Sequence, residues 1–463
     1  MNIIFLLSDT FRYDNLLERA AVPVRTPNLD RFLQRAVSVE NFYTGSFPTI
    51  PQRTDLISGR IGWPRHGWQH IEKSTTNLLP AVLREKGYVS QLICDCPHLF
   101  KTGFNLVFDA AHALRGQEGD VHFLRMNDKI HQAMPPEKTR TSRHFKDRYL
   151  IDLHTWQNAA AVCEEDKFAA RTARKTVQWL EHNYRQGPFF LWVDFFDPHE
   201  PWDPPEYMVP KYNPGYSGAP MLHPNYGRAD DYTPEELANL RAHYCAESEL
   251  VDRWIGRIFE KLTDLGLWDN SIVVFSTDHG INLGEHNRTG KSNANDSDSR
   301  RWPIYPETAH IPFLISAPGL QGGRSVQTLG QPADIIPTIM ELADIQAEFP
   351  EELHGCSLTR SLRTGSDHSE RELVVSALHP PLDNKGNLPA QNATTPAVYT
   401  REWCWIPAGE TGPELYRLPE DPGATTNMAA ENMDVIRELS KKVLSWLAEV
   451  SAPENLKPIF SAG

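Results

Sequence analysis

Ile3-Ile4-Phe5-Leu6-Leu7-Ser8-Asp9 lies at the start of the chain, and this stretch decides the fold class. Five consecutive apolar residues predict a buried strand, and Asp9 then stands at the C-terminal end of that strand. A second apolar run, at residues 270–276, ends in Thr277-Asp278-His279-Gly280. Ligands bind outside the C-terminal ends of the strands in an open α/β sheet, so both ends point to one shared site.

Strands and helices alternate through the rest of the first 320 residues. Apolar runs at 89–94, 188–196 and 311–316 predict further buried strands. Residues 166–183 and 234–265 carry apolar positions near helical spacing. This alternation predicts an α/β fold with a mostly parallel central sheet flanked by helices.

The pattern changes near residue 370. Short strands are expected at 372–378 and 396–406, and a terminal helix at 433–450. We therefore expect a catalytic domain over residues 1–370 and a smaller α+β subdomain over 371–463.

The composition and net charge restrict the partners and the cell compartment that we expect. The 463 residues carry a net charge of −14, which argues against nucleic acid as the main partner, because phosphate backbones require Lys/Arg stripes. A pocket on an acidic protein can still be locally positive and bind an anionic substrate. No basic segment precedes the first apolar run, and that run is too short for a signal peptide or a membrane helix. The sequence predicts a cytoplasmic protein without a membrane partner.

Asp9, Asp278 and His279 form a candidate site for one divalent metal ion. Carboxylate oxygens suit Ca, Mg or Mn, and the imidazole also permits Zn. The alternative interpretation is a solvated Asp-His turn without a ligand. Residues 284–308 are polar with few apolar anchors, which is typical of an active-site loop.

A third segment makes the interpretation specific: Thr49-Ile50-Pro51-Gln52-Arg53-Thr54-Asp55-Leu56-Ile57-Ser58-Gly59-Arg60. It resembles the Cys/Ser-x-Pro-x-Arg signature of the sulfatase branch of the alkaline phosphatase superfamily, except at its first residue. Other stretches resemble later landmarks of that family, in the family's order: Pro198-His199-Glu200-Pro201-Trp202, residues 270–290 with Lys291, Asp334-Ile335-Ile336-Pro337-Thr338, and Glu414-Leu415-Tyr416-Arg417-Leu418.

The resemblance implies an alkaline phosphatase-like fold and a small-molecule anionic ester as substrate. It assigns the metal ion to Asp9, Thr49, Asp278 and His279. Thr49 would be the nucleophile, and Arg53 would neutralise and orient the region around it. Lys291 would bind substrate oxygens, and His199 would bind the ester or protonate its leaving group. Each of the last three also has an alternative role: a structural ion pair for Arg53, a surface loop for Lys291, and a satisfied loop histidine for His199.

Two departures from the family pattern concern the surroundings of the site. Many sulfatases have two adjacent aspartates after the first strand, whereas Thr10 follows Asp9 here. The family also often has Lys-x-His after the strand that follows Gly-Tyr, whereas Asp95 and His98 occupy this region here. Both are candidates for substrate binding, and loop packing is the alternative for each.

The third departure, Thr49, bears on the reaction. Sulfatases oxidise their cysteine or serine to formylglycine, an aldehyde whose hydrate attacks sulfur, and threonine would give a ketone instead. An unmodified threonine beside a metal can attack phosphorus. The sequence thus favours cleavage of phosphodiesters or phosphonate monoesters. The alternatives are a sulfuric ester hydrolase and a catalytically degenerate homologue that only binds a metal or an anion.

Overall fold

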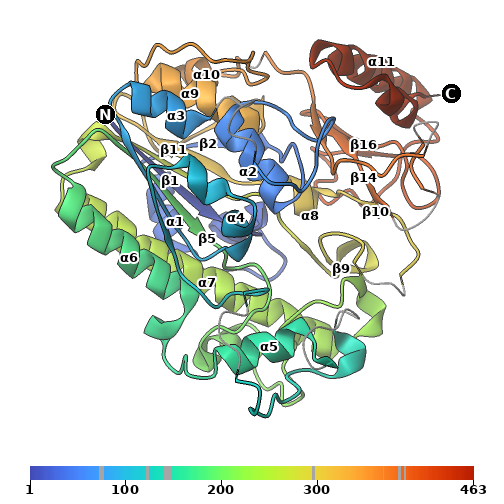
Figure 1. The fold of residues 1–463 in the computed structure, drawn as a ribbon. Coiled ribbons are helices and arrows are strands. Elements are labelled where there is room, and N and C mark those ends of the chain that lie inside the picture. The colour runs from blue at the N-terminus through green and yellow to red at the C-terminus, as the bar shows by residue number, and fades with distance from the viewer. Residues whose placement is uncertain are drawn as a thin grey trace.

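The computed structural model describes residues 1–71, 78–120, 125–139, 147–294, 298–368, 370–383, 387–389 and 393–462. Its centre is an eight-stranded sheet with the order β12-β2-β11-β7-β1-β5-β3-β4 (Figure 1). The strands are β1 (Asn2–Ser8), β2 (Val37–Phe42), β3 (Val89–Cys94), β4 (Ala110–Ala113), β5 (Phe189–Phe195), β7 (Ser271–Ser276), β11 (Phe313–Ser316) and β12 (Arg324–Gly330).

The first strand, β1, lies in the interior of this sheet and is parallel to both of its neighbours. Leu7 is opposite Asp194 of β5 on one side and Ser276 of β7 on the other. Only β11 runs antiparallel to its neighbours, β7 and β2. The predicted mostly parallel sheet is confirmed, and the residues that follow β1 and β7 leave the sheet at the same edge.

Alternate residues of β1 face opposite layers of helices, because successive side chains of a strand point to opposite faces. Ile4 and Leu6 belong to the core shared with α1 (Pro27–Leu33), α6 (Phe168–Asn183) and α7 (Pro234–Asp264). Ile3, Phe5 and Leu7 belong to the opposite core. That layer contains α2 (Thr49–Ser58), α3 (Leu79–Glu85), α9 (Ile335–Leu342) and α10 (Thr359–Thr364). Two further helices are α4 (Pro97–Lys101) and α5 (Leu150–Gln157).

A four-stranded antiparallel sheet and a long helix form the C-terminal part of the chain (Figure 1). The strands are β13 (Val374–Ser376), β15 (Ala397–Tyr399), β16 (Trp403–Ile406) and β17 (Glu414–Arg417), and the helix is α11 (Met433–Glu449). Their core includes Ile61 and Trp63 from the region after α2. The division at residue 370 stays a prediction, because this core joins both parts of the chain.

The segment after β13 pairs with the backbone that leads into α2. The Ala377 amide donates to the Gly45 carbonyl, and the Phe47 amide donates to the Ala377 carbonyl, both at 2.9 Å. The Ser376 hydroxyl also donates to the Thr44 carbonyl at 2.5 Å. The C-terminal sheet thus fixes the residues that immediately precede Thr49.

The expected loop at 284–308 is more ordered than its composition indicated. It contains β9 (Arg288–Gly290), which pairs with β6 (Gly227–Arg228) and β8 (Asn282–Leu283). It also contains β10 (Trp302–Pro303), paired with β14 (Thr394–Thr395), and α8 (Pro306–Ala309). Strands of two or three residues are too short to leave a periodic signal, which is why the sequence indicated only a loop. Residues 295–297 lie outside the described residues.

No helix within the described ranges has the length and apolar character needed to span a bilayer.

Candidate active site

Asp9, Asp278 and His279 meet where β1 and β7 end. One ligand atom from each lies within 4.8 Å of the others. The His279 Nε2 is 3.4 Å from an Asp278 carboxylate oxygen and 4.0 Å from one of Asp9. All three side chains are fully buried. The structure therefore brings together the three residues that the strand ends predicted.

The orientation of His279 fits a metal ligand. Its Nδ1 lies 2.9 Å from the Gly280 carbonyl, so this nitrogen carries the proton in the neutral ring. Its buried Nε2 has no hydrogen-bond partner among the described residues. Burial lowers the pKa of His279 to about 4, so the ring is neutral near pH 7. A free imidazole lone pair facing two carboxylates suits a divalent cation, with the backbone carbonyl orienting the ring.

Arg53, on α2, holds these carboxylates together. Its guanidinium donates to both oxygens of Asp194, at 2.8 and 2.9 Å. It also donates to Asp278 at 2.7 Å and to Asp9 at 3.1 Å. Three ionised carboxylates and one guanidinium leave two negative charges, the charge that one divalent ion balances. Burial and the neighbouring Asp278 raise the pKa of Asp9 well above its usual range, so Asp9 favours a proton unless a cation is bound.

Asp194 is a member of this group that the sequence did not reveal. It lies on β5, opposite Leu7 of the central strand, and is fully buried. Its signal was one carboxylate within the otherwise apolar strand Phe189–Phe195. A charge in such a strand requires a buried partner, and Arg53 supplies it.

Thr10 stands where many sulfatases have a second aspartate. Its hydroxyl donates to Asp9 at 2.7 Å, and its amide donates to Asp278 at 3.0 Å. Its φ of 63° lies in the left-handed region, which β-branched residues rarely adopt. The Tyr244 hydroxyl donates to the Thr10 carbonyl at 2.9 Å and supports this turn. Thr10 therefore orients Asp9 without adding a negative charge to the site.

Thr49 is the first residue of α2 and is 2% exposed. Its carbonyl accepts a hydrogen bond of 3.1 Å from Arg53, the same side chain that contacts Asp9 and Asp278. Two residues earlier, the Phe47 ring lies 5.0 Å from the His279 ring. The helix start is thus fixed beside the acidic group. The roles of Thr49 as ligand and nucleophile stay predictions.

Lys291 and His199 lie in an adjoining group. The Lys291 ammonium is 3.5 Å from the Thr10 hydroxyl and 3.7 Å from a Glu200 carboxylate oxygen. The His199 ring stacks on Phe196 at 4.0 Å, and its Nδ1 lies 2.6 Å from the Glu200 carbonyl. Burial and Lys291 lower the pKa of His199 well below its usual range. A neutral His199 is suited to binding an ester and is a poor proton donor at pH 7.

The structure separates the two predicted substrate-binding residues. His98 packs edge-on against the exposed Trp68 at 5.1 Å and against Phe196 at 5.8 Å, next to His199. Asp95 instead uses one oxygen for the Phe196 amide, at 2.6 Å, and the other for the Thr172 hydroxyl, at 3.1 Å. Asp95 therefore positions the loop that carries His199, and this contact favours the packing alternative for that residue.

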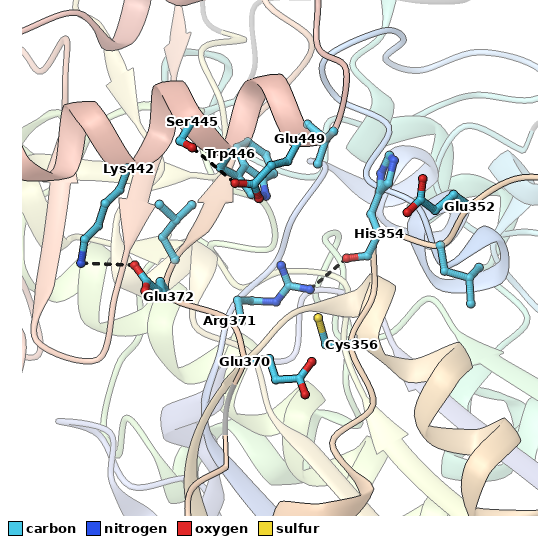
Figure 2. Close-up of a pocket in the computed structure, with 13 residues that line it drawn as sticks. Glu352, His354, Cys356, Glu370, Arg371, Glu372, Lys442, Ser445, Trp446 and Glu449 are labelled. Atoms are coloured by element: carbon cyan, nitrogen blue, oxygen red, sulfur yellow. Dashed lines mark hydrogen bonds and ion pairs between the residues drawn. The ribbon is translucent and has the colours of Figure 1, made fainter.

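A cavity of about 500 Å³ lies elsewhere, between α11 and the segment around residues 352–373 (Figure 2). Two of its cationic side chains, Lys442 and Arg371, already have partners. Lys442 contacts Glu372 at 3.3 Å, and Arg371 donates to the His354 carbonyl at 3.2 Å. Arg371 also pairs with Asp334. This cavity is therefore a weaker candidate for the active site than the buried group around Arg53.

Comparisons with known proteins identify the family of the chain. The sulfatase family model matches residues 1–345. Human arylsulfatase K is 25% identical over 480 residues, covering 96% of this chain and 82% of its own. An arylsulfatase of Clostridium perfringens is 24% identical over 391 residues, covering 77% of each chain.

Solved structures share the fold. The phosphonate monoester hydrolase of Agrobacterium radiobacter has a TM-score of 0.73 at 22% identity, covering 97% of this chain and 96% of its own. A protein solved with its substrate D-glucosamine-2-N,6-O-disulfate has a TM-score of 0.72 at 16% identity, covering 98% and 99%. The family model matches residues 1–345, and the strand ends carry a buried acidic site. The chain belongs to the sulfatase family, whose members hydrolyse sulfuric or phosphonate esters.

Proposed function

We propose that this enzyme cleaves phosphodiesters or phosphonate monoesters with the unmodified hydroxyl of Thr49 as nucleophile, aided by one divalent ion. The observation that carries the proposal is the threonine itself, because it begins α2 beside Arg53 where the family places its modified residue. Asp9, Asp278 and His279 would hold the ion together with Thr49. When bound, the ion would lower the cost of deprotonating the Thr49 hydroxyl.

The chain's own groups support a two-step reaction. The Thr49 hydroxyl releases its proton to solvent, its oxygen attacks phosphorus, and the bond from phosphorus to the leaving alcohol breaks. Lys291 counters the negative charge of the transferring group. Arg53, whose guanidinium is bonded to Asp194, Asp278 and Asp9, holds these carboxylates beside Thr49. Water then attacks phosphorus in phosphoryl-Thr49, the bond to the threonine oxygen breaks, and the hydroxyl is restored. A neutral His199 binds the ester in this scheme, and water supplies the proton for the leaving alcohol.

Sulfuric ester hydrolysis is the second candidate, favoured by the arylsulfatases among the relatives. A sulfated threonine fits this chemistry poorly. The formylglycine hydrate has a second hydroxyl that helps to expel sulfate by breaking a carbon–oxygen bond, and threonine has none. This difference favours phosphorus over sulfur as the centre attacked.

The test is a substrate panel with matched variants. The Mn²⁺-loaded enzyme is assayed on 4-nitrophenyl derivatives of a phosphodiester, a phosphonate monoester, a phosphate monoester and sulfate. We expect turnover of the first two, loss of turnover in Thr49→Ala, and partial activity in Thr49→Ser. Thr54→Ala is the control, because Thr54 lies on the same helix and its hydroxyl donates to the Ile50 carbonyl. Intact-mass analysis checks that Thr49 is unmodified.

Three results would overturn the proposal. Turnover of sulfate alone would establish the second candidate. A wild-type rate in Thr49→Ala would point to water as the attacking group. No turnover of any ester, with metal still bound, would indicate a degenerate binding protein.

A further inference from the structure

A second group of potential metal ligands adjoins Lys291, whose ammonium lies 3.7 Å from Glu200, one of its members. Glu118, Glu200 and His223 each place one ligand atom within 4.8 Å of the others. Their exposed fractions are 6%, 0% and 2%. The three residues follow β4, follow β5 and precede β6, so the tertiary fold alone brings them together.

His223 is oriented in the same way as His279. Its Nδ1 lies 2.7 Å from the Pro224 carbonyl, as the Nδ1 of His279 lies beside the Gly280 carbonyl. The buried Nε2 of His223 has no hydrogen-bond partner in the described part of the chain. The facing oxygen of Glu118 is 3.9 Å away, too far for a hydrogen bond. The ring thus offers a free lone pair to two carboxylates.

Glu200 supplies a second free ligand atom. One of its oxygens accepts a hydrogen bond from the Tyr226 hydroxyl and lies 3.7 Å from Lys291. The other oxygen is buried and has no hydrogen-bond partner within the described ranges. The Nδ1 of the neutral His199 is 3.6 Å away, too far for a hydrogen bond. A buried carboxylate oxygen without a partner costs free energy, and a bound cation would remove this cost.

We propose that Glu118, Glu200 and His223 form a second divalent-cation site. One imidazole and two carboxylates suit Zn²⁺ or Mn²⁺. The ion would lie close to the substrate, because Lys291 contacts both Glu200 of this group and Thr10. An imidazole binds a cation as its neutral ring, so the two carboxylates and Lys291 sum to −1, and a divalent ion makes the group +1. That charge favours an anionic ester, whether its acid is phosphoric, phosphonic or sulfuric.

Metal content, measured without substrate, tests this site. The protein and its variants are equilibrated with Mn²⁺ or Zn²⁺, freed of loose metal by gel filtration, and analysed by mass spectrometry of the elements. We expect two equivalents in the wild type and one each in Glu118→Gln, Glu200→Gln and His223→Ala. Asp278→Asn should also hold one, and Asp278→Asn combined with His223→Ala should hold none. His243→Gln, which changes a buried histidine outside both groups, should keep two.

Cobalt substitution provides a second readout. Adding Co²⁺ should give two d–d absorption components, and His223→Ala should remove one of them while Asp278→Asn removes the other. Circular dichroism identifies any variant that does not fold. The variants that fold then show whether the second group binds a cation.

A wild type that holds one equivalent at saturating Mn²⁺ and Zn²⁺ would overturn the proposal. So would two equivalents retained in all three variants of the second group. Because no ester is hydrolysed in this experiment, its outcome is independent of the outcome of the substrate panel.

Discussion

At the scale of single residues, Arg53 is the strongest structural determinant of the site. Replacing Arg53 with Met leaves Asp9, Asp194 and Asp278 without their shared cation. Breaking a buried ion pair from one side typically costs about 3–5 kcal/mol. We expect a loss of that order in the free energy of unfolding, measured by urea denaturation without added metal. Arg174→Met, at an exposed arginine, is the control. Equal losses in the free energy of unfolding of the two variants would contradict a special structural role for Arg53.

Lys291 should matter to turnover more than to stability. Its nearest polar contacts, at 3.5 and 3.7 Å, are long, so removing them changes the folded state little. Loss of one fixed cation beside the transferring group typically lowers kcat by about 10²–10³-fold. Lys291→Ala should show this fall in kcat with a small change in Tm, whereas Lys175→Ala, at a half-buried lysine of α6, should change neither. A fall in Tm comparable to that of Arg53→Met would mark Lys291 as structural.

The sequence allowed some of these residues to be predicted and others not. Asp9, Asp278 and His279 follow apolar runs directly, so their meeting followed from the rule that parallel strands end at one edge. Asp194 left only the signal of one carboxylate within an apolar strand, and Glu118 and His223 left no local signal. Their contacts depend on how separate segments pack, which no spacing within one segment can reveal.

At the scale of elements, the turn after β1 depends on α7. The Tyr244 hydroxyl accepts from the Arg12 amide at 2.9 Å and donates to the Thr10 carbonyl at 2.9 Å. Tyr244→Phe leaves both buried groups without this partner, which typically costs about 1–3 kcal/mol. We expect a lower Tm and, because Asp9 adjoins this turn, weaker Mn²⁺ binding in calorimetry. Tyr184→Phe, at the residue that follows α6, is the control. Unchanged Mn²⁺ affinity would show that the turn after β1 keeps its conformation without the Tyr244 hydroxyl.

Asp55, within α2, should make the free energy of unfolding depend on pH. Its carboxylate accepts from the Ser46 amide and hydroxyl and from the Gly62 amide, each at 2.9 Å. Burial nevertheless raises the pKa of Asp55 from 3.8 to about 7. The folded state therefore favours the protonated form. Its stabilisation is fully present below about pH 4 and is lost as the pH rises through about 7.

Asp55→Asn isolates this contribution, because asparagine has no proton to lose. The stability of the wild type relative to Asp55→Asn should fall between about pH 4 and pH 7, measured by urea denaturation at several pH values. Parallel pH profiles would mean that the hydrogen bonds keep Asp55 ionised throughout.

At the scale of the whole molecule, the C-terminal sheet and the catalytic core depend on each other. A chain ending at residue 370 would expose Ile61 and Trp63 and remove the backbone pairing of Gly45 and Phe47 with Ala377. We expect this shortened chain to be insoluble or inactive, as measured by its soluble fraction and by turnover. A soluble, active product would establish residues 1–370 as an independent domain.

The overall architecture was more predictable than its details. Alternating apolar runs and helical patterns indicated a sheet flanked by helices, and the long helices α6 and α7 show a period because they bury many side chains. The short helices α2, α9 and α10 of the opposite layer were not predicted. The pairing of Ala377 with the residues before Thr49 left no trace in the sequence. It joins positions about 330 residues apart through backbone groups, which every residue type offers alike.

The interior position of β1 has a consequence for synthesis on the ribosome. β1 is synthesised before its partners β5 and β7, which begin at residues 189 and 271. At roughly 5–20 residues per second, this apolar strand waits about 10–35 s for β5 and longer for β7. During that interval Ile3–Leu7 would be an exposed apolar segment of the growing chain. Reliable production should therefore depend on chaperones that bind nascent chains, and on the speed of translation.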